Sequence, residues 1–415
     1  MPETVYDSKV YQLAVIGAGP AGLSAAYNAA KEGVETIILE EHKKVGEPVH
    51  CGECLSKIAA ERIKLQLPPD SIAQKVKGIR VVFPDGTDVI LREEGYALHK
   101  EIFEQYLAVR AQGAGATLRT GVRILGMARK EGIWSLNSSV CAIKANVVID
   151  ASGYESVSNK LTKINQKKFE IINGAQYLIE NVQNDGFIEF FLWPRLAPHG
   201  YLWIIPKGEG RANVGIVSND PKTIHKNLKK FLKEKALDKS KIIRPFGGAI
   251  PSSGPFPRTH ADGILLAGDA AGFTSPMFEG GTQLALKSGE LAGQTIANIV
   301  KDSKKPKEKT PEEKGKKEVG DLFLENSLKP YEAAWKKEFP PYPKLLKANE
   351  HFYQYNEQEL NQIAKILPED LTSVGIGGKL KIGVRLITQA PKLATKNFSS
   401  AMKAFSYSTG KNYGW

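Results

Sequence analysis

The stretch Leu13-Ala14-Val15-Ile16-Gly17-Ala18-Gly19-Pro20-Ala21-Gly22 is an apolar strand that runs into a glycine-rich turn and then a helix. Gly17 allows the tight turn, Gly19 lets the backbone approach a pyrophosphate, and Gly22 lets the helix pack closely on the strand. The helix, which Ala21 helps to open, offers unpaired N–H groups and a positive dipole end to phosphates. The pattern predicts a dinucleotide-binding α/β fold.

Two further segments favour FAD as the dinucleotide. A second strand over 34–39 ends at Glu40, roughly 20 residues past the glycines, where a carboxylate binds ribose hydroxyls. Much later, the strand within 263–272 ends in Gly-Asp, and a glycine-rich run and a helix over 284–299 follow. Asp after a strand is also common in turns and helix caps. We nevertheless expect Asp269, Gly281 and Thr282 to contact the cofactor at a second helix N-terminus.

The composition bounds the class of protein. The 415 residues suffice for two or three domains. No apolar run reaches the roughly 18 residues of a membrane-spanning helix, and the polar N-terminus does not resemble a signal peptide. Three cysteines cannot form a disulfide framework or a four-cysteine iron–sulfur site. We therefore expect a cytoplasmic protein.

The net charge of +12 is unevenly distributed. Residues 371–415 contain no Asp or Glu but seven Lys or Arg residues. This segment is a solvated tail, a face for anionic lipid headgroups, or a nucleic-acid contact, although no recognition motif accompanies it. We expect peripheral association with the inner face of the membrane and no nucleic acid. The expected apolar side of this face comprises Leu380, Ile382, Leu386, Ile387, Leu393, Phe398, Met402 and Phe405.

Two further stretches carry a family resemblance. They are Val45-Gly46-Glu47-Pro48-Val49-His50-Cys51-Gly52-Glu53-Cys54 and Gly200-Tyr201-Leu202-Trp203-Ile204-Ile205-Pro206-Lys207. With the two glycine motifs they resemble, in order, the geranylgeranyl reductase family of flavoproteins. That family has a Pro-x-x-Cys-Gly loop, a Tyr-x-Trp-x-Phe-Pro strand and a Gly-Asp-Ala-Ala-Gly segment. The resemblance covers nearly all of the chain before about residue 340, where residues 328–335 are similar to the helix that follows the family's cofactor domain.

The resemblance implies a fold of the α/β class. We expect an FAD-binding Rossmann-like domain of the glutathione reductase or p-hydroxybenzoate hydroxylase type, formed from residues 1–75, 96–160 and 255–300. Two-residue alternation in 78–83 and 186–215 predicts an antiparallel substrate domain over 76–95 and 161–254. A charged linker over 301–320 and a basic, helical region over 321–415 complete the predicted layout.

Cys51 is the catalytic candidate, because the family's cysteine loop lies near the flavin ring. Cys51 could orient the ring, supply a proton, or form a redox pair with Cys54. Metal binding is not expected, since no second ligand pair exists. The resemblance also implies cofactor contacts for Gly52, for Val122 and for Lys100, which stands where the family usually has Arg.

Saturation of an isolated prenyl double bond needs a hydride at one carbon and a proton at the other. The alkene has no polar handle, so apolar contacts must position it. Tyr201, Trp203 and Ile205 alternate onto one strand face and form the expected wall, although ordinary core packing would look the same. The other candidates are Phe187, Phe190, Phe191 and Trp193 for the wall and His199 for a proton.

The resemblance implies an FAD-dependent reductase of geranylgeranyl chains, with archaeal digeranylgeranylglycerol phospholipids as the expected substrate. The alternatives are an aromatic monooxygenase, a flavin halogenase, a relative of electron-transferring flavoprotein–quinone oxidoreductase, and a non-enzymatic flavin or lipid sensor. No second glycine fingerprint indicates a dedicated NADPH domain. The electron donor is therefore NADPH, a deazaflavin or ferredoxin.

Overall fold

The computed structural model describes residues 6–166, 168–305, 322–372 and 374–415. Most of the predicted linker, residues 306–320, lies outside the described residues, and residues 301–303 end a helix instead. Within the described ranges, no helix has both the length and the apolar character needed to cross a membrane.

The first of the two large sheets has eight strands and is parallel at its centre. Its main order is β17-β18-β11-β1-β2-β8, and the β9–β10 hairpin extends from β11. The predicted strands at 13–16, 34–39, 117–119 and 145–150 are neighbours in it, which confirms the α/β class. The strands are β1 (Tyr6–Ile16), β2 (Thr36–Leu39), β8 (Thr117–Arg119), β9 (Ile124–Lys130), β10 (Ile133–Ser138), β11 (Ala142–Asp150), β17 (His260–Ala261) and β18 (Ile264–Leu266).

Two long helices pack against this sheet with unusually close backbones. They are α1 (Pro20–Ala30) and α6 (Thr282–Ser303), and α6 is longer than the predicted 284–299. A Cβ atom at Gly289 or Gly293 of α6 would overlap the carbonyl oxygen of Ala21 or Ala25 of α1. The glycines therefore bring the N-terminal ends of the two helices together. Other helices of this part are α2 (Lys57–Arg62), α3 (Lys100–Gly113) and α4 (Val157–Thr162).

The second large sheet has seven strands in the order β16-β12-β15-β14-β13-β5-β6. It is antiparallel as predicted, except that β5 runs parallel to β13. A small sheet, β3-β7-β4, contains Cys54 and directly follows Cys51 and Gly52 in the chain. The strands are β3 (Cys54–Ser56), β4 (Ile72–Val76), β5 (Ile79–Val82), β6 (Asp88–Leu91), β7 (Gly95–Leu98), β12 (Ile171–Ile179), β13 (Ile188–Phe191), β14 (Tyr201–Pro206), β15 (Ala212–Ser218) and β16 (Ile242–Pro251). Helix α5 (Ile224–Glu234) packs on one face of this sheet.

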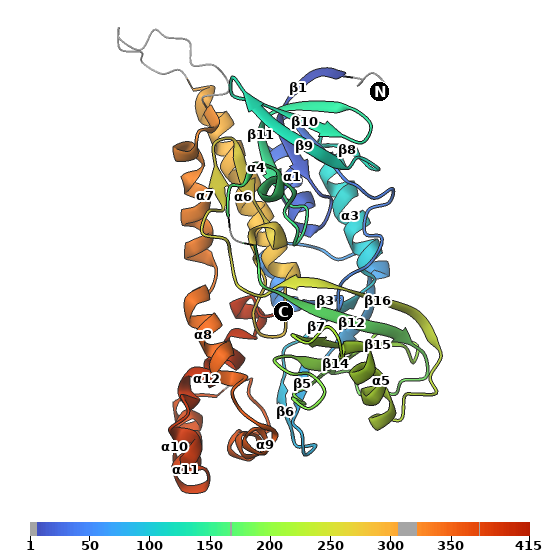
Figure 1. The fold of residues 1–415 in the computed structure, drawn as a ribbon, viewed down its shortest axis with the longest axis vertical. Coiled ribbons are helices and arrows are strands. Elements are labelled where there is room, and N and C mark those ends of the chain that lie inside the picture. The colour runs from blue at the N-terminus through green and yellow to red at the C-terminus, as the bar shows by residue number, and fades with distance from the viewer. Residues whose placement is uncertain (1–5, 167, 306–321, 373) are drawn as a thin grey trace.

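The C-terminal helices run along one side of the molecule and cover the opposite face of the second sheet (Figure 1). The predicted helical region at 322–367 is confirmed, with its break at the proline-rich turn. These helices are α7 (Glu325–Glu338), α8 (Tyr342–Phe352), α9 (Glu357–Ile366), α10 (Ile376–Gln389), α11 (Pro391–Ala394) and α12 (Phe398–Tyr407). Leu393 and Phe398, which we expected on a lipid-facing side, are buried in the hydrophobic cluster beneath them.

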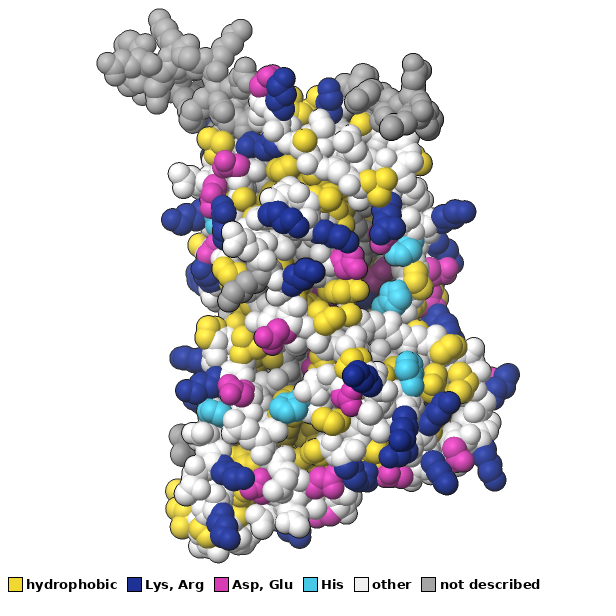
Figure 2. All heavy atoms as spheres, in the orientation of Figure 1, with side chains coloured by type: hydrophobic (Ala, Val, Ile, Leu, Met, Phe, Trp, Pro, Cys, Tyr) yellow, Lys and Arg dark blue, Asp and Glu magenta, His cyan; other side chains and the backbone are white. Residues whose placement is uncertain are grey.

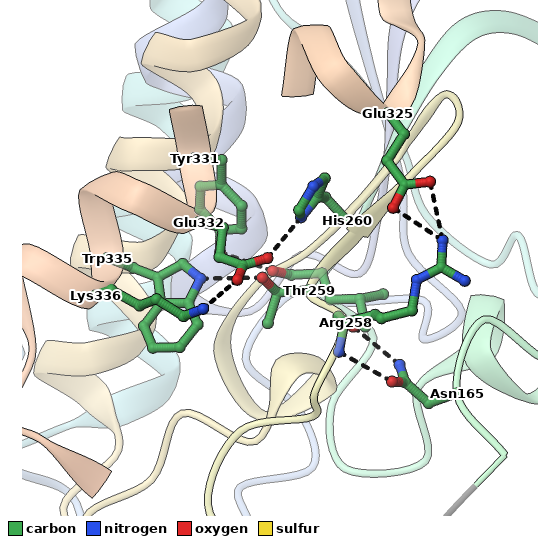
Figure 3. Close-up of polar contacts among 10 residues, drawn as sticks. Asn165, Arg258, Thr259, His260, Glu325, Tyr331, Glu332, Trp335 and Lys336 are labelled. Atoms are coloured by element: carbon green, nitrogen blue, oxygen red, sulfur yellow. Dashed lines mark hydrogen bonds and ion pairs between the residues drawn. The ribbon is translucent and has the colours of Figure 1, made fainter. Parts of the chain in front are cut away.

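Helix α7 is fixed to the edge of the first sheet by buried and half-buried polar contacts (Figure 3). The Trp335 Nε1 donates to Thr259 Oγ1 at 3.0 Å, and the Tyr331 hydroxyl donates to the carbonyl oxygen of Leu266 at 2.7 Å. Arg258–Glu325, His260–Glu332 and Lys336–Glu332 ion pairs surround them. The C-terminal helical region is thereby joined to the first sheet.

The contact between α1 and α6 gives a first test. Gly293→Ala should lower the free energy of unfolding by about 1–3 kcal/mol, because the added methyl group has no space against Ala25. Gly383→Ala, in the interior of α10 where nothing lies within 4 Å of the added Cβ, should be neutral or slightly stabilising. Urea unfolding of both variants measures the difference. Equal stability of the two would contradict this account of the contact.

Candidate active site

The glycine-rich turn has the shape that a phosphate-binding turn requires. Gly17 has a φ of +96°, and a Cβ there would lie 2.5 Å from the carbonyl oxygen of Ala151. A Cβ at Gly22 would overlap the carbonyl oxygen of Gly17. Gly19, by contrast, has no atom within 4 Å of such a Cβ, and no side chain caps α1. The N-terminus of α1 therefore has open space and unsatisfied N–H groups, which fits a pyrophosphate.

The carboxylate of Glu40 lies beside this turn. Its Oε2 accepts a hydrogen bond from the Ala18 backbone at 2.7 Å, and its Oε1 lies 2.7 Å from Nδ1 of His42. The backbone N–H of the buried Val122 donates to the Glu40 carbonyl oxygen at 2.8 Å. Glu40 and Val122 are therefore neighbours next to the turn, and the carboxylate has the position that ribose recognition needs.

The Gly-Asp segment lies at the start of α6, next to α1. Asp269 is half-buried and accepts a hydrogen bond from Thr274 at 3.4 Å, and a Cβ at Gly281 would lie 3.7 Å from its Oδ1. Burial raises the pKa of Asp269, while Thr274 and the Lys100 cation partly offset this. Helix α6 begins at Thr282 without a side-chain cap. Two uncapped helix N-termini thus meet near Asp269 and Lys100, and this arrangement fits a dinucleotide.

The Cys51 loop rests directly on the predicted substrate wall. Gln176 connects the two: its Nε2 donates to the Cys51 carbonyl oxygen at 2.8 Å, and its Oε1 accepts from Trp203 Nε1 at 3.0 Å. A Cβ at Gly52 would lie 3.3 Å from Cδ1 of Ile205. The thiol of Cys51 accepts a hydrogen bond from the Glu53 backbone at 3.2 Å. The structure therefore brings Cys51, Trp203 and Ile205 together.

A buried ion pair holds this loop, and sequence reasoning missed it. Glu53 Oε2 lies 3.0 Å from Nζ of Lys207, and their side chains are 1% and 5% exposed. Asn213 and the Lys100 backbone donate to the same carboxylate, at 2.6 Å and 3.1 Å. The two-residue alternation of β14 could have indicated this pair, because it puts the Lys207 side chain on the same face as Tyr201, Trp203 and Ile205.

Lys100 carries the second buried cation of this region and pairs with Glu104. Burial lowers the pKa of Lys100, but the attraction of Glu104, Cys51 and Glu53 outweighs burial and raises it. Lys100 therefore stays charged near the Cys51 loop. This agrees with the positive charge that the family usually places here as Arg.

Tyr201 connects the wall to the start of α6. Its ring centroid lies 5.0 Å from Phe190 and 5.1 Å from Phe278. Its hydroxyl is hydrogen-bonded with Glu279, whose pKa burial raises to about 8 although this hydrogen bond lowers it. Glu279 is a further residue that sequence reasoning did not place in the site. The available signal was an acidic residue in the glycine-rich turn Phe278-Glu279-Gly280-Gly281 that precedes α6.

Several predicted wall residues lie elsewhere. Phe191 and Trp193 face α5 on the opposite side of the sheet, with ring centroids 4.9 Å and 5.5 Å from Phe231. Phe190, by contrast, lies on the same face as Tyr201, Trp203 and Ile205, because adjacent strand residues point to opposite faces. Phe187 packs under the guanidinium of Arg80, with 4.9 Å from its Cζ to the ring centroid.

The remaining candidates lie at the margins of this site. His199 is exposed, with its ring centroid 5.8 Å from that of Tyr353. Cys51 and Cys54 are free thiols. Burial and the nearby Cys51 raise the pKa of the Cys54 thiol, so that it stays protonated.

Comparisons with known proteins agree with this geometry. Residues 12–158 match the FAD dependent oxidoreductase family, and residues 170–250 match the geranylgeranyl reductase catalytic domain. The digeranylgeranylglycerophospholipid reductase of Methanocaldococcus jannaschii is 33% identical over 92% of this chain and 96% of its own length. That of Methanothrix thermoacetophila is 34% identical over 90% and 95%.

Solved structures give the same result. A geranylgeranyl bacteriochlorophyll reductase-like protein from Thermoplasma acidophilum superposes with a TM-score of 0.82 at 27% identity, over 94% of this chain and 99% of its own. A halogenase superposes with a TM-score of 0.68 at 14% identity, over 86% and 79%, which shows the shared fold alone. The chain belongs to the geranylgeranyl reductase family of FAD-dependent oxidoreductases.

Proposed function

We propose that the protein saturates the carbon–carbon double bonds of geranylgeranyl chains in digeranylgeranylglycerol phospholipids. The observation that supports this proposal is that the Cys51–Gly52 loop lies against Ile205 and is bridged to Trp203 by Gln176, so that the loop proposed to hold the flavin adjoins a buried apolar strand face. The names of the relatives support the substrate class. FAD, when bound and reduced, supplies a hydride to the alkene.

The residues around the two helix N-termini are proposed to hold FAD. The glycine-rich turn and α1 would bind the pyrophosphate, and Glu40 would bind the ribose hydroxyls, with Val122 beside it. Cys51, Gly52 and Lys100 are assigned to the ring end of the cofactor, where Cys51 would orient the flavin. The complete proposed set is Gly17, Gly19, Ala21, Gly22, Glu40, Cys51, Gly52, Lys100, Val122, Asp269, Gly281 and Thr282.

Tyr201, Trp203 and Ile205 are proposed to hold the prenyl chain. All three are buried in a cluster of aromatic and aliphatic side chains between the second sheet and the C-terminal helices. Such surroundings position an alkene by shape and exclude water. The prenyl chain would enter between the sheet and these helices. The electrons would come from a reduced donor, for which ferredoxin, a deazaflavin and NADPH remain candidates.

Helix α10 is proposed to dock on an anionic membrane surface. Leu380, Val384 and Ile387 lie on one face of it and are 69%, 54% and 69% exposed. The other face, with Ile382 and Leu386, packs against the cluster that contains the substrate wall. Lysines flank the exposed face, and Figure 2 shows hydrophobic side chains gathered at the end of the molecule where Figure 1 places α10 and α11. An apolar stripe with basic flanks is typical of interfacial helices.

The reaction itself can be tested in a single anaerobic experiment. We expect the dithionite-reduced protein to be reoxidised by digeranylgeranylglycerol phosphate, with a mass gain of two hydrogens per double bond. Flavin absorbance measures the reoxidation of the cofactor, and mass spectrometry measures the saturation of the lipid. A fully saturated lipid serves as the control and should leave the flavin reduced. Flavin reduction without any mass change in the lipid would contradict the proposal.

The ion pair beneath the Cys51 loop gives a stability prediction. Lys207→Met should lower the free energy of unfolding by about 3–5 kcal/mol, because the buried Glu53 carboxylate loses its counterion. Lys207→Met should also weaken FAD binding. Adding Glu53→Gln should restore part of the stability and part of the FAD affinity. Lys57→Met, which breaks the exposed pair with Glu94, is the matched control and should leave the free energy of unfolding nearly unchanged, because solvent screens that pair. Similar losses for the two single variants would refute the role of the buried pair.

Membrane docking is tested by flotation with phosphatidylglycerol vesicles. We expect the vesicle affinity to fall to roughly one tenth of the wild-type value or lower in a variant that combines Leu380→Ser, Val384→Ser and Ile387→Ser, since three exposed apolar side chains are lost. The control carries Val109→Ser, Leu125→Ser and Val140→Ser. These three residues are similarly exposed but belong to the part of the molecule that contains the first sheet. Binding should also weaken at high salt. Unchanged binding of the α10 variant would exclude this face.

A further inference from the structure

The carboxyl group of Glu279 lies where the FAD-binding segment meets the aromatic wall. Glu279 precedes Gly280 and Gly281, and a Cβ at Gly281 would lie 3.7 Å from Oδ1 of Asp269 at the start of α6. On the other side, Phe278 stacks on Phe190 with ring centroids 4.5 Å apart. Phe278 and Glu279 both have positive φ values, +62° and +44°, where glycine would be unstrained. The chain thus keeps an acidic side chain at a strained position between the two parts of the site.

The Glu279 carboxyl has polar partners on two elements. The hydroxyl of Tyr201 on β14 is hydrogen-bonded with it. Tyr353, which follows α8, also lies close enough to interact electrostatically with it, and neither the Tyr353 hydroxyl nor Glu279 Oε2 has a hydrogen-bond partner in the described part of the chain. Cys54 lies near Tyr201, and the exposed His199 lies beside Tyr353. A buried carboxyl oxygen is therefore left to interact with a ligand.

The neighbouring groups are poor proton donors near neutral pH. Burial and the Glu279 charge hold the pKa values of Tyr201 and Tyr353 well above the usual range for tyrosine. Burial also raises the pKa of the Cys54 thiol. Burial raises the pKa of Glu279 only to about 8, so this carboxyl is protonated at neutral pH yet releases its proton readily. General acids work best with pKa values close to the working pH.

We propose that Glu279 is the catalytic acid of the reduction. Its O–H bond breaks as a C–H bond forms at one alkene carbon, while the hydride supplied by reduced FAD forms the C–H bond at the other carbon. The alkene is reduced, the flavin is oxidised, and Glu279 is left as a carboxylate that takes a proton from water before the next turnover. This assignment rests on the proposed function and adds to it the source of the proton.

The test compares Glu279→Gln with the wild type, after anaerobic reduction, on digeranylgeranylglycerol phosphate. Gln keeps the shape and the hydrogen bond to Tyr201 but cannot donate a proton. We expect unchanged FAD content and dithionite reduction, with alkene saturation slowed roughly 100-fold or more. Glu279→Asp should recover part of the rate. Glu290→Gln, which removes a half-buried carboxylate paired with Lys287 on the same helix, is the matched control and should react at the wild-type rate.

The pH profile separates an acid from a structural residue. The wild-type rate of saturation should be constant below the pKa of Glu279 and fall as the pH rises through about 8, because only the protonated carboxyl donates. The Glu279→Gln variant should lack this fall in rate at high pH. If the wild type saturates the lipid and Glu279→Gln does so at the same rate with the same profile, the assignment is wrong and the reductase activity stands. A wild-type rate that does not fall near this pH also overturns the assignment of Glu279, even if the variant fails to fold. A wild type that leaves the lipid unchanged overturns both proposals.

Discussion

The contact between the Cys51 loop and β14 is the constraint on which the site depends. The loop belongs to the part of the chain that follows Glu40 at the end of β2, whereas β14 belongs to the second sheet. The Glu53–Lys207 ion pair and the Gln176 bridge hold the two together across more than a hundred residues of sequence. A buried ion pair adds little net stability compared with apolar packing, but it is costly to break, so it fixes one arrangement. The wall and the cofactor loop therefore face each other in a single geometry.

Local patterns were sufficient to predict where the residues proposed to hold the cofactor lie in the fold. The glycine turn, Glu40 and Asp269 each follow a strand of the first sheet, so strand and turn spacing determines where they lie. Gln176, Glu53 and Lys207 could not be assigned in this way, because their roles depend on how two distant segments pack. The sequence shows only that Lys207 follows the same two-residue alternation as the apolar residues Tyr201, Trp203 and Ile205. The fold class and the C-terminal helices could be predicted from periodicity, although the parallel β5–β13 pairing could not.

The errors in the predicted wall and lipid face have a common physical cause. Phe190 and Phe191 were grouped together, although strand neighbours point to opposite faces and Phe191 packs against α5. In the same way, the predicted lipid face mixed Leu380 and Ile387, which are exposed, with Leu393 and Phe398, which are buried. Composition identified the right segments in both cases. Only the three-dimensional packing separates the side chains that hold the core from those left for a ligand or a membrane.

The Cys51–Gly52 loop is proposed to hold the flavin against the aromatic wall. A crystal structure of the protein with FAD and a saturated analogue of the lipid tests it most directly. We expect the flavin ring to lie against Cys51 and Gly52, with the prenyl chain between the ring and the side chains of Tyr201 and Trp203. A ring that lies away from the Cys51 loop, or a chain bound on the α5 face of the sheet, would contradict it.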